Sequence, residues 1–376
     1  MNTAAGPRLG DRQRLAWLRL IRTSNVGPAS FRDLINRFGS AEAALEMLPE
    51  LAISGGAARI VRIPTVAEAE AEMEAARKAG ARFVAVGEPD YPPLLRRMEH
   101  PPPLLAVKGH GAVFHLPAVA IVGARNASLA GIKMARTLAA GLGAEGYGVV
   151  SGLARGIDTA AHQGSLASGT VGVLAGGLDQ PYPAENAGLC EEIAERGGAI
   201  VSEMPFGWQP RAQDFPRRNR IVAGMALGLV VVEAANRSGS LISARLAGEM
   251  GRLVFAVPGS PLDPRAGGTN GLLKEGAILV TETADVVGAL APLAGLPPPP
   301  SGPLEEPPDF AATPPPGEDD RARVVEALGP TPVAIDEIIR HTGLHPAQVF
   351  MILLELDLAG RLERHAGGSV SLVFVD

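Results

Sequence analysis

Residues 215–243 read FPRRNRIVAGMALGLVVVEAANRSGSLIS. The continuous apolar run Leu227–Val232 at the centre of this stretch predicts a strand buried on both faces, as in a parallel sheet. A Ser-Gly-Ser sequence and a helical pattern follow, so the stretch reads as one strand-to-helix unit of an α/β fold. A ring and four guanidinium groups bracket the run, from Phe215, Arg217, Arg218, Arg220 and Arg237. These groups suit stacking on a base and pairing with phosphates.

The same alternation of apolar strands and helical segments extends over much of the chain, after an alanine-rich helix at Val66–Ala79. Continuous apolar strands separated by helices predict a parallel, doubly wound sheet. Ligands bind outside the carboxyl ends of the strands in such sheets, so we expect the site at that edge. The predicted strands are Phe83–Val86, Ala118–Val122, Val149–Val150, Val171–Leu174, Ala199–Val201, Leu229–Val232, Leu253–Val257 and Ala277–Val280.

The N-terminal part of the chain predicts a small helical domain. Apolar residues recur at helical spacing from Gln13 to Met47, around a turn at Asn25-Val26-Gly27-Pro28. Such a turn is compatible with a helix-hairpin-helix or SAM-like unit that contacts a nucleic-acid backbone. Such turns also simply reverse a chain, and short motifs of this kind often match by chance.

The C-terminal part predicts a second small domain behind a linker. Eleven prolines between Pro292 and Asp320 indicate an extended segment. Three helices and a hairpin follow, in the order of a winged helix. The third helix, Pro346–Ala359, carries no basic residue, so we expect it to contact another protein or another part of this chain rather than DNA. The predicted domains are 1–75 (helical), 76–291 (sheet), 292–320 (linker) and 321–376 (winged-helix-like).

Composition bounds the class of protein. The chain has 376 residues, 46% hydrophobic and 20% charged, which is enough to bury a sizeable core. Its formal net charge of -6 would repel a polyanion, so a nucleic-acid site must be a local basic surface. Between Pro205 and Arg252, seven arginines face three acidic residues, a local excess of four positive charges.

Cysteine usage and hydropathy indicate a cytoplasmic protein that needs no metal. Cys190 is the single cysteine, and no Cys/His cluster has metal-ligand spacing. Neither a signal peptide nor an apolar run of about 20 residues, the length needed to cross a bilayer, is present.

Three glycine- or serine-rich loops follow predicted strands and open helices, where backbone amides can bind a phosphate. They are Gly123-Ala124-Arg125, Ser151–Asp158 and Ser238-Gly239-Ser240. Each alone is also compatible with an ordinary turn or helix cap, for instance by Asn126–Ser128 after the first loop. The first loop does not fit G-x-G-x-x-G, so we infer no dinucleotide cofactor. Three such loops on one strand edge favour a ligand with several phosphates.

Phe215–Arg220 is expected to display its ring and arginines on a turn fixed by the proline. In the alternative, Asn219 and one arginine point inward and brace the loop. Asp158 and His162 lie one helical turn apart, a spacing more typical of a structural hydrogen bond than of half a catalytic triad. The residues predicted to bind nucleic acid are Gly123, Arg125, Ser151, Gly152, Gly156, Phe215, Arg217, Arg218, Asn219, Arg220, Ser238, Gly239 and Ser240, and no catalytic residue is predicted.

Together these motifs resemble the DNA-processing protein A (DprA, or Smf) family. The resemblance also rests on Gly177-Leu178-Asp179, Tyr182-Pro183, Ser202–Pro205 and Val257-Pro258-Gly259. It implies an extended Rossmann-like domain that binds single-stranded DNA and protects it during natural transformation. It further implies loading of a RecA-type recombinase, a homodimer and no catalysis. By the same resemblance, Arg125 binds phosphate, Phe215 stacks on a base, and Ser238–Ser240 lines the same pocket.

Two other classes of function stay open on the sequence. One is a Rossmann-like nucleotide hydrolase or phosphoribohydrolase with Glu233 as its acid or base, although the chain has no Walker lysine motif and no paired carboxylates. The other is a structural interaction protein in which the glycine loops are only turns.

Overall fold

The computed structural model describes residues 8–59, 61–294, 315–365 and 367–373. The chain divides into two compact units. The sheet unit comprises Met1–Leu9 and Ala71–Pro298, and the terminal unit comprises Gly10–Glu70 and Pro299–Asp376. Most of the predicted linker, at 295–314, lies outside the described residues.

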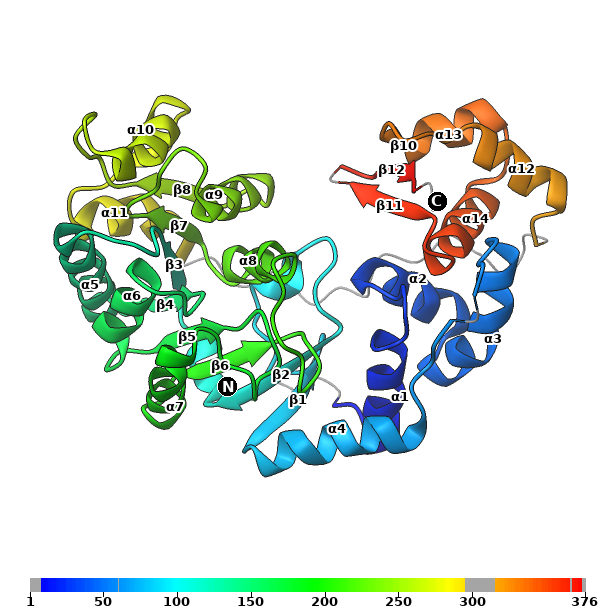
Figure 1. Ribbon diagram of the computed structural model, residues 1–376, viewed down its shortest axis with the longest axis horizontal. Helices are drawn as coiled ribbons and strands as arrows, with labels where there is room; N and C mark the ends of the chain where they lie inside the picture. The colour runs from blue at the N-terminus through cyan, green and yellow to red at the C-terminus, as the bar shows by residue number, and fades with distance from the viewer. Residues whose placement is uncertain (1–7, 60, 295–314, 366, 374–376) are drawn as a thin grey trace. The chain divides into compact units, whose positions relative to one another are not determined.

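A nine-stranded sheet forms the centre of the sheet unit, in the order β1-β2-β6-β5-β4-β3-β7-β8-β9 (Figure 1). All neighbouring strands from β6 to β9 run parallel, which confirms the predicted doubly wound sheet. The strands are β1 (Ala81–Ala85), β2 (Leu104–Gly109), β3 (Ala118–Val122), β4 (Gly148–Ser151), β5 (Thr170–Val173), β6 (Ala199–Ser202), β7 (Gly228–Val231), β8 (Leu253–Ala256) and β9 (Ile278–Leu279).

Helices cover both faces of this sheet, because its strands carry apolar side chains on both faces, as in β3. Its alternate side chains point to opposite faces. Val119 and Ile121 join the core under α5, α6 and α11, while Ala120 and Val122 join the core under α8 and α9. The helices of this unit are α4 (Val66–Lys78), in which the division between the units falls, α5 (Leu129–Ala144), α6 (Ile157–Ser165), α7 (Ala187–Glu195), α8 (Asp214–Gly224), α9 (Gly239–Glu249), α10 (Gly267–Lys274) and α11 (Thr283–Ala294).

The sheet differs from the expectation at one edge. β2 is not among the predicted strands, and it pairs antiparallel with both β1 and β6. Parallel strands are usually joined by a crossover that contains an α-helix, whereas the only helical element between β1 and β2 is the short 3-10 turn Leu95–Arg97. The chain therefore returns antiparallel at this edge.

The terminal unit joins helices from both ends of the chain, in agreement with the expectation that the helix at Pro346–Ala359 contacts another protein or another part of this chain. Its C-terminal part has the predicted winged-helix order, with a three-stranded sheet in the order β10-β12-β11. The first helix of this part begins three residues before residue 321, the predicted start of the winged-helix-like domain. At the other boundary, α11 ends at Ala294, beyond the predicted end of the sheet domain at 291. The elements are α1 (Asp11–Ile21), α2 (Pro28–Phe38), α3 (Ala41–Ser54), α12 (Glu318–Glu326), β10 (Val333–Ala334), α13 (Ile335–Thr342), α14 (Pro346–Leu358), β11 (Leu362–His365) and β12 (Ser369–Leu372).

Candidate nucleic-acid interface

The candidate site lies at the carboxyl ends of β4, β3 and β7, which are adjacent in the sheet. The chain runs from β3 to β4 on one side and returns at β7 on the other, so the strand order reverses between β3 and β7. Such a switch point is where open α/β sheets bind ligands. The three predicted loops follow these strands, with Gly123–Ser128 after β3, Gly152–Gly156 after β4 and Ser238–Ser240 at the start of α9.

The loops after β3 and β4 are in direct backbone contact. The Ile157 amide donates to Ala124 O over 3.2 Å. Gly156 has a φ of 75°, and a Cβ there would lie 2.4 Å from Ala124 O and 2.7 Å from Arg125 O. Only glycine combines this backbone conformation with so close an approach. The contact fixes the backbone of Arg125 against the second loop.

Three side chains from separate segments form an aromatic cluster, which we define as Arg125, Tyr182 and Phe215. The Arg125 guanidinium carbon lies 5.1 Å from the centroid of the Phe215 ring. The Tyr182 ring meets the Phe215 ring edge to face, with a centroid separation of 5.7 Å. Arg125 is exposed, Tyr182 is 53% exposed, and Phe215 is partly buried. The cluster therefore presents a cation and rings to solvent at the switch point.

Phe215 lies at the start of a helix, so the expected turn around Pro216 is wrong. α8 begins at Asp214 and places Pro216 in its first turn, where a missing amide hydrogen breaks no helical hydrogen bond. The Asp214 carboxylate accepts hydrogen bonds from Trp208 Nε1 over 2.9 Å and from the Arg211 amide over 2.8 Å. This bracing fixes the beginning of the helix and with it the Phe215 ring.

Arg218 points into the molecule, as in the inward-facing alternative. It is 5% exposed, and its guanidinium donates to Val173 O over 2.9 Å and to Gly152 O. The buried Asp158 carboxylate accepts from the amides of Gly152 and Ala154. Burial lowers the pKa of Arg218 to about 10 and raises the pKa of Asp158, while the attraction between the two charges opposes both shifts. Arg218 thus supports the second loop from behind.

His162 lies beneath the same loop and is fully buried. The Thr170 hydroxyl donates to Val149 O over 3.0 Å, so it accepts from His162 Nδ1 at 2.8 Å, which assigns the proton to Nδ1. Nε2 has no hydrogen-bond partner among the described residues. Burial, followed by repulsion from Arg218, lowers the pKa of His162 to about 3. His162 is therefore a neutral structural side chain.

This burial predicts acid sensitivity. The unfolded chain binds a proton at His162 below pH 6.5, and the folded chain does so only near pH 3. Stability contributed by the neutral imidazole is therefore present above pH 6.5 and lost as the pH falls. We expect urea denaturation to show a loss of about 2 kcal/mol from this group between pH 7 and pH 5. His162→Asn keeps a donor toward Thr170 and should flatten the pH dependence, whereas an unchanged slope would contradict the assignment.

Two other predicted residues are buried behind the loops. Ser151 Oγ donates to Ile121 O over 2.6 Å, and Ser151 is fully buried. Ser240 Oγ lies 2.7 Å from the oxygen of Ser238, the residue that caps α9. Their contacts shape the loops from within.

The remaining predicted residues connect α8 to its surroundings or face solvent. Arg220 forms an ion pair with Glu203, and Asn219 Nδ2 donates to the carbonyl of Gly239 over 3.4 Å. Arg217 is exposed. Gly123 is tightly enclosed, because a Cβ there would lie 2.7 Å from Ile157 Cγ1.

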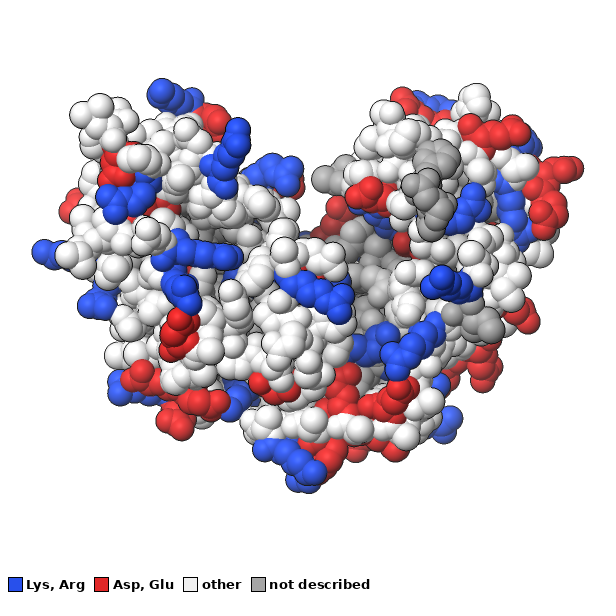
Figure 2. Space-filling model, viewed as in Figure 1, with Lys and Arg blue, Asp and Glu red and all other residues white. Residues whose placement is uncertain are grey.

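The exposed cations of this region come from α8, α9 and the segments before them. Arg211, Arg217, Arg237 and Arg245 are exposed, and Arg245 lies 3.8 Å from Glu249. In Figure 2, the charged side chains over α8 and α9 on the visible face are mainly Lys and Arg. This surface has the sign that phosphate contacts require, although the whole chain is acidic.

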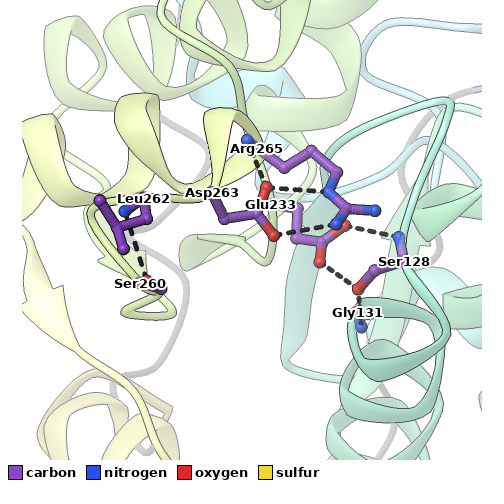
Figure 3. A network of polar contacts seen from close by, with 7 residues as sticks. All are labelled: Ser128, Gly131, Glu233, Ser260, Leu262, Asp263 and Arg265. Atoms are coloured by element: carbon purple, nitrogen blue, oxygen red, sulfur yellow. Dashed lines mark hydrogen bonds and ion pairs between the residues drawn. The ribbon is translucent and has the colours of Figure 1, made fainter.

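Glu233, which follows β7, is held by the start of α5 (Figure 3). One carboxylate oxygen accepts from the Ser128 amide over 2.9 Å, and the other accepts from the Ser128 hydroxyl. A Cβ at Gly131 would lie 2.5 Å from Glu233 Cδ, so the carboxylate rests on the first turn of the helix. Arg265, whose pKa is raised chiefly by its hydrogen bonds with Asp263, stands beside it. Glu233 thus ties β7 to α5.

Within the described ranges, no group of three or more His, Cys, Asp or Glu side chains could hold a metal ion. Cys190 is buried, and burial raises the pKa of its thiol to about 12. Across the same part of the chain, no helix combines the length and apolar character needed to cross a membrane.

Sequence reasoning missed Tyr182 and Arg211 as site residues. Tyr182 is one aromatic residue in an irregular segment, and only folding brings it to Phe215. The Arg211 guanidinium carbon lies 4.4 Å from the Trp208 ring centroid. The sequence does contain a signal for Arg211. It lies three positions after Trp208 and shortly before Phe215, a spacing that could have indicated a second cation beside a ring.

Comparison with known proteins assigns all three parts of the chain. The family described as DNA recombination-mediator protein A matches residues 82–291, a DprA-like N-terminal HHH domain matches 11–75, and a DprA winged helix domain matches 306–368. Protein Smf of Escherichia coli is 39% identical over 285 residues, 75% of each chain. A putative DNA processing protein DprA of Mycobacterium tuberculosis is 37% identical over 94% of this chain and 92% of its own.

Solved structures agree with this assignment. DNA processing protein A from Streptococcus pneumoniae superposes with a TM-score of 0.57 at 34% identity, over 74% of this chain and 93% of that one. The Helicobacter pylori protein, whose structure is described for its single-stranded DNA binding mode, gives 0.52 at 29% identity over 56% and 97%. With its sheet unit, N-terminal helices and winged helix all matched, the chain belongs to the DprA/Smf family of DNA processing proteins.

Proposed function

We propose that the chain binds single-stranded DNA without regard to base sequence, through the aromatic cluster and the loops at the switch point. The observation that carries this proposal is the Phe215 ring, which contacts both Arg125, from the loop after β3, and the half-exposed Tyr182. A ring accepts any base by stacking, and guanidinium groups and amides accept any phosphate. The single-stranded DNA binding described for the Helicobacter pylori relative supports the same ligand.

We extend the proposal by family membership to the biological role. On that ground, the chain protects single strands in the cytoplasm during natural transformation and helps to load a RecA-type recombinase. It acts as a homodimer without catalysing a reaction. In the proposed site, phosphates contact the exposed Arg125 and Arg217 and the loop amides. Arg218 and Arg220 support the surface from behind.

The test is a titration of the full chain with a fluorescent single-stranded oligonucleotide and its duplex at several salt concentrations. Salt-sensitive binding that prefers the single strand supports the proposal. Binding of neither form, or equal binding of both, would overturn it.

Replacing Arg125 with alanine is expected to weaken binding to every oligonucleotide sequence and to flatten its salt dependence. Loss of one phosphate contact reduces the slope of log K against log salt by about 0.7 for single strands. The same titration measures both quantities. Arg196→Ala is the matched control, because Arg196 is exposed and follows α7 at the opposite edge of the sheet, where β6 begins. Equal effects of the two variants would contradict the assignment.

The enzyme alternative depends on Glu233. Both carboxylate oxygens accept hydrogen bonds from Ser128, which favours a structural role over general acid or base chemistry. The test is a screen of nucleoside monophosphates for turnover. Turnover by the wild type that disappears in Glu233→Gln would support the enzyme alternative, and absence of turnover supports the binding proposal.

A further inference from the structure

The third helix of the winged-helix part, α14, is apolar on two sides. Its residues 349, 352, 353 and 356 belong to the core of its own domain. A second stripe, Met351, Leu354 and Leu358, belongs instead to the core of the N-terminal helices, with Phe31 and Leu48 among its members. A helix that is hydrophobic nearly all round is a buried helix. In DNA-binding winged helices, the corresponding helix must instead leave one face open for the major groove.

Hydrogen bonds also join α14 to the N-terminal helices. Asn25 Nδ2 donates to Leu358 O over 3.0 Å and satisfies a carbonyl at the C-terminal end of α14. On the other side, Arg361 Nη1 donates to Gly55 O, the carbonyl of the C-cap of α3, over 3.1 Å. These hydrogen bonds, at the C-terminal ends of α14 and α3, orient the two parts more specifically than apolar contact alone.

A charged network lies along the boundary as well. Arg364 bridges two carboxylates, Asp33 in the N-terminal part at 3.0 Å and Asp357 on α14 at 2.9 Å. Glu355 is buried, and its two carboxylate oxygens accept one hydrogen bond each from Arg321 Nε and Nη2, both over 2.8 Å. The acidic groups of α14 are thus neutralised by arginines of its own domain, and α14 carries no cation for a phosphate.

The backbones approach closely at one point. A Cβ on Gly55 would lie 1.9 Å from Glu355 O, so the C-terminal end of α3 rests directly on the backbone of α14. Gly55 has an ordinary φ of -74°, so its absent side chain reflects this contact rather than a strained turn.

We propose that α14 is a protein-binding helix whose partner is the chain's own N-terminal helical domain. The two ends of the chain form one module, and the winged helix does not read duplex DNA through α14. The binding mode is an apolar helix face laid on a helical surface. All residues that carry this proposal belong to the terminal unit.

The test uses the full chain with a sequence-specific protease site inserted in residues 301–312. After cleavage, size-exclusion chromatography shows whether the C-terminal fragment stays with the rest. We expect the two fragments to co-elute. Separation of the cleaved wild type would overturn the proposal.

Two variants locate the interface from its two sides. Leu354→Glu places a charge on the second stripe, and Gly55→Ala creates a clash with α14 without entering either core. Each should reduce the co-eluting fragment at least tenfold. Phe350→Glu, on the exposed side of α14, and Gly329→Ala, with nothing within 4 Å of the added Cβ, are the matched controls.

Retention of the fragment in both Leu354→Glu and Gly55→Ala would overturn the proposed interface. Because Gly55→Ala leaves the core of each part intact, release in that variant alone still supports it. Duplex binding by the uncleaved chain gives a second readout. If Phe350→Glu, on the exposed side of α14, lowered duplex affinity tenfold while Gly329→Ala did not, α14 would be a DNA-reading helix and the proposal would fail.

Discussion

Replacing Phe215 with alanine is expected to weaken single-stranded DNA binding by about 5-fold to 150-fold, which corresponds to the 1–3 kcal/mol that stacking of one base contributes. The ring is the central member of the aromatic cluster, in contact with both Arg125 and Tyr182. Its loss removes the stacking surface and also frees Arg125 from its cation–π contact. Fluorescence titration of the variant at fixed salt measures the effect.

The pattern across ligands distinguishes stacking from general damage. Bases in a duplex are already stacked on one another, so duplex binding should fall much less than single-strand binding. The salt slope should stay unchanged, because no phosphate contact is lost. Phe350→Ala removes another partly exposed phenylalanine, in the terminal unit, and should leave both affinities unchanged. Equal losses on single strands and duplex would contradict the stacking role.

Replacing Arg218 with methionine is expected to lower the free energy of unfolding by about 3–5 kcal/mol, the usual effect of leaving a buried charge without its compensating cation. The substitution leaves the buried Asp158 carboxylate without its nearby cation. It also removes the donors to Gly152 O and Val173 O. Urea denaturation followed by circular dichroism measures the change.

The neighbouring arginine provides the control. Arg217 is exposed, so Arg217→Met should change stability by no more than about 0.5 kcal/mol. In DNA titrations we expect the reverse order of effects: Arg217→Met should weaken binding more than Arg218→Met, because Arg217 faces solvent near the aromatic cluster and Arg218 is buried. A stability loss in Arg218→Met no larger than that in Arg217→Met would show that the buried Arg218 guanidinium is not a major stabilising group.

Much of the sheet was predictable because burial on both faces leaves a local signal. Ala118–Val122 is apolar at every position, and the structure gives the predicted bounds of this strand unchanged. β2 was missed because its segment, LLAVKG, follows three prolines and reads as a loop end. Its antiparallel pairing depends on distant partners in β1 and β6.

The site was predictable as a location and less so in its details. The strand edge follows from topology, but the inward direction of Arg218 depends on α8. On a helix, Arg218 shares a face with residues three and four positions later, the buried Ile221 and Val222. Reading Pro216 as a turn hid that periodicity, although proline is compatible with a first helical turn. The approach of Tyr182 to Phe215 carries no local signal.

The shared core of the two chain ends has a consequence during synthesis on the ribosome. Asn25 and its acceptor Leu358 are separated by 333 positions. At about 5–20 residues per second, translation separates the N-terminal helices from the appearance of α14 by roughly 15–70 seconds. Throughout that interval the apolar surface that later receives Met351, Leu354 and Leu358 has no cover from its own chain. A nascent chain of this protein therefore leaves an apolar surface without its final cover until α14 has been synthesised.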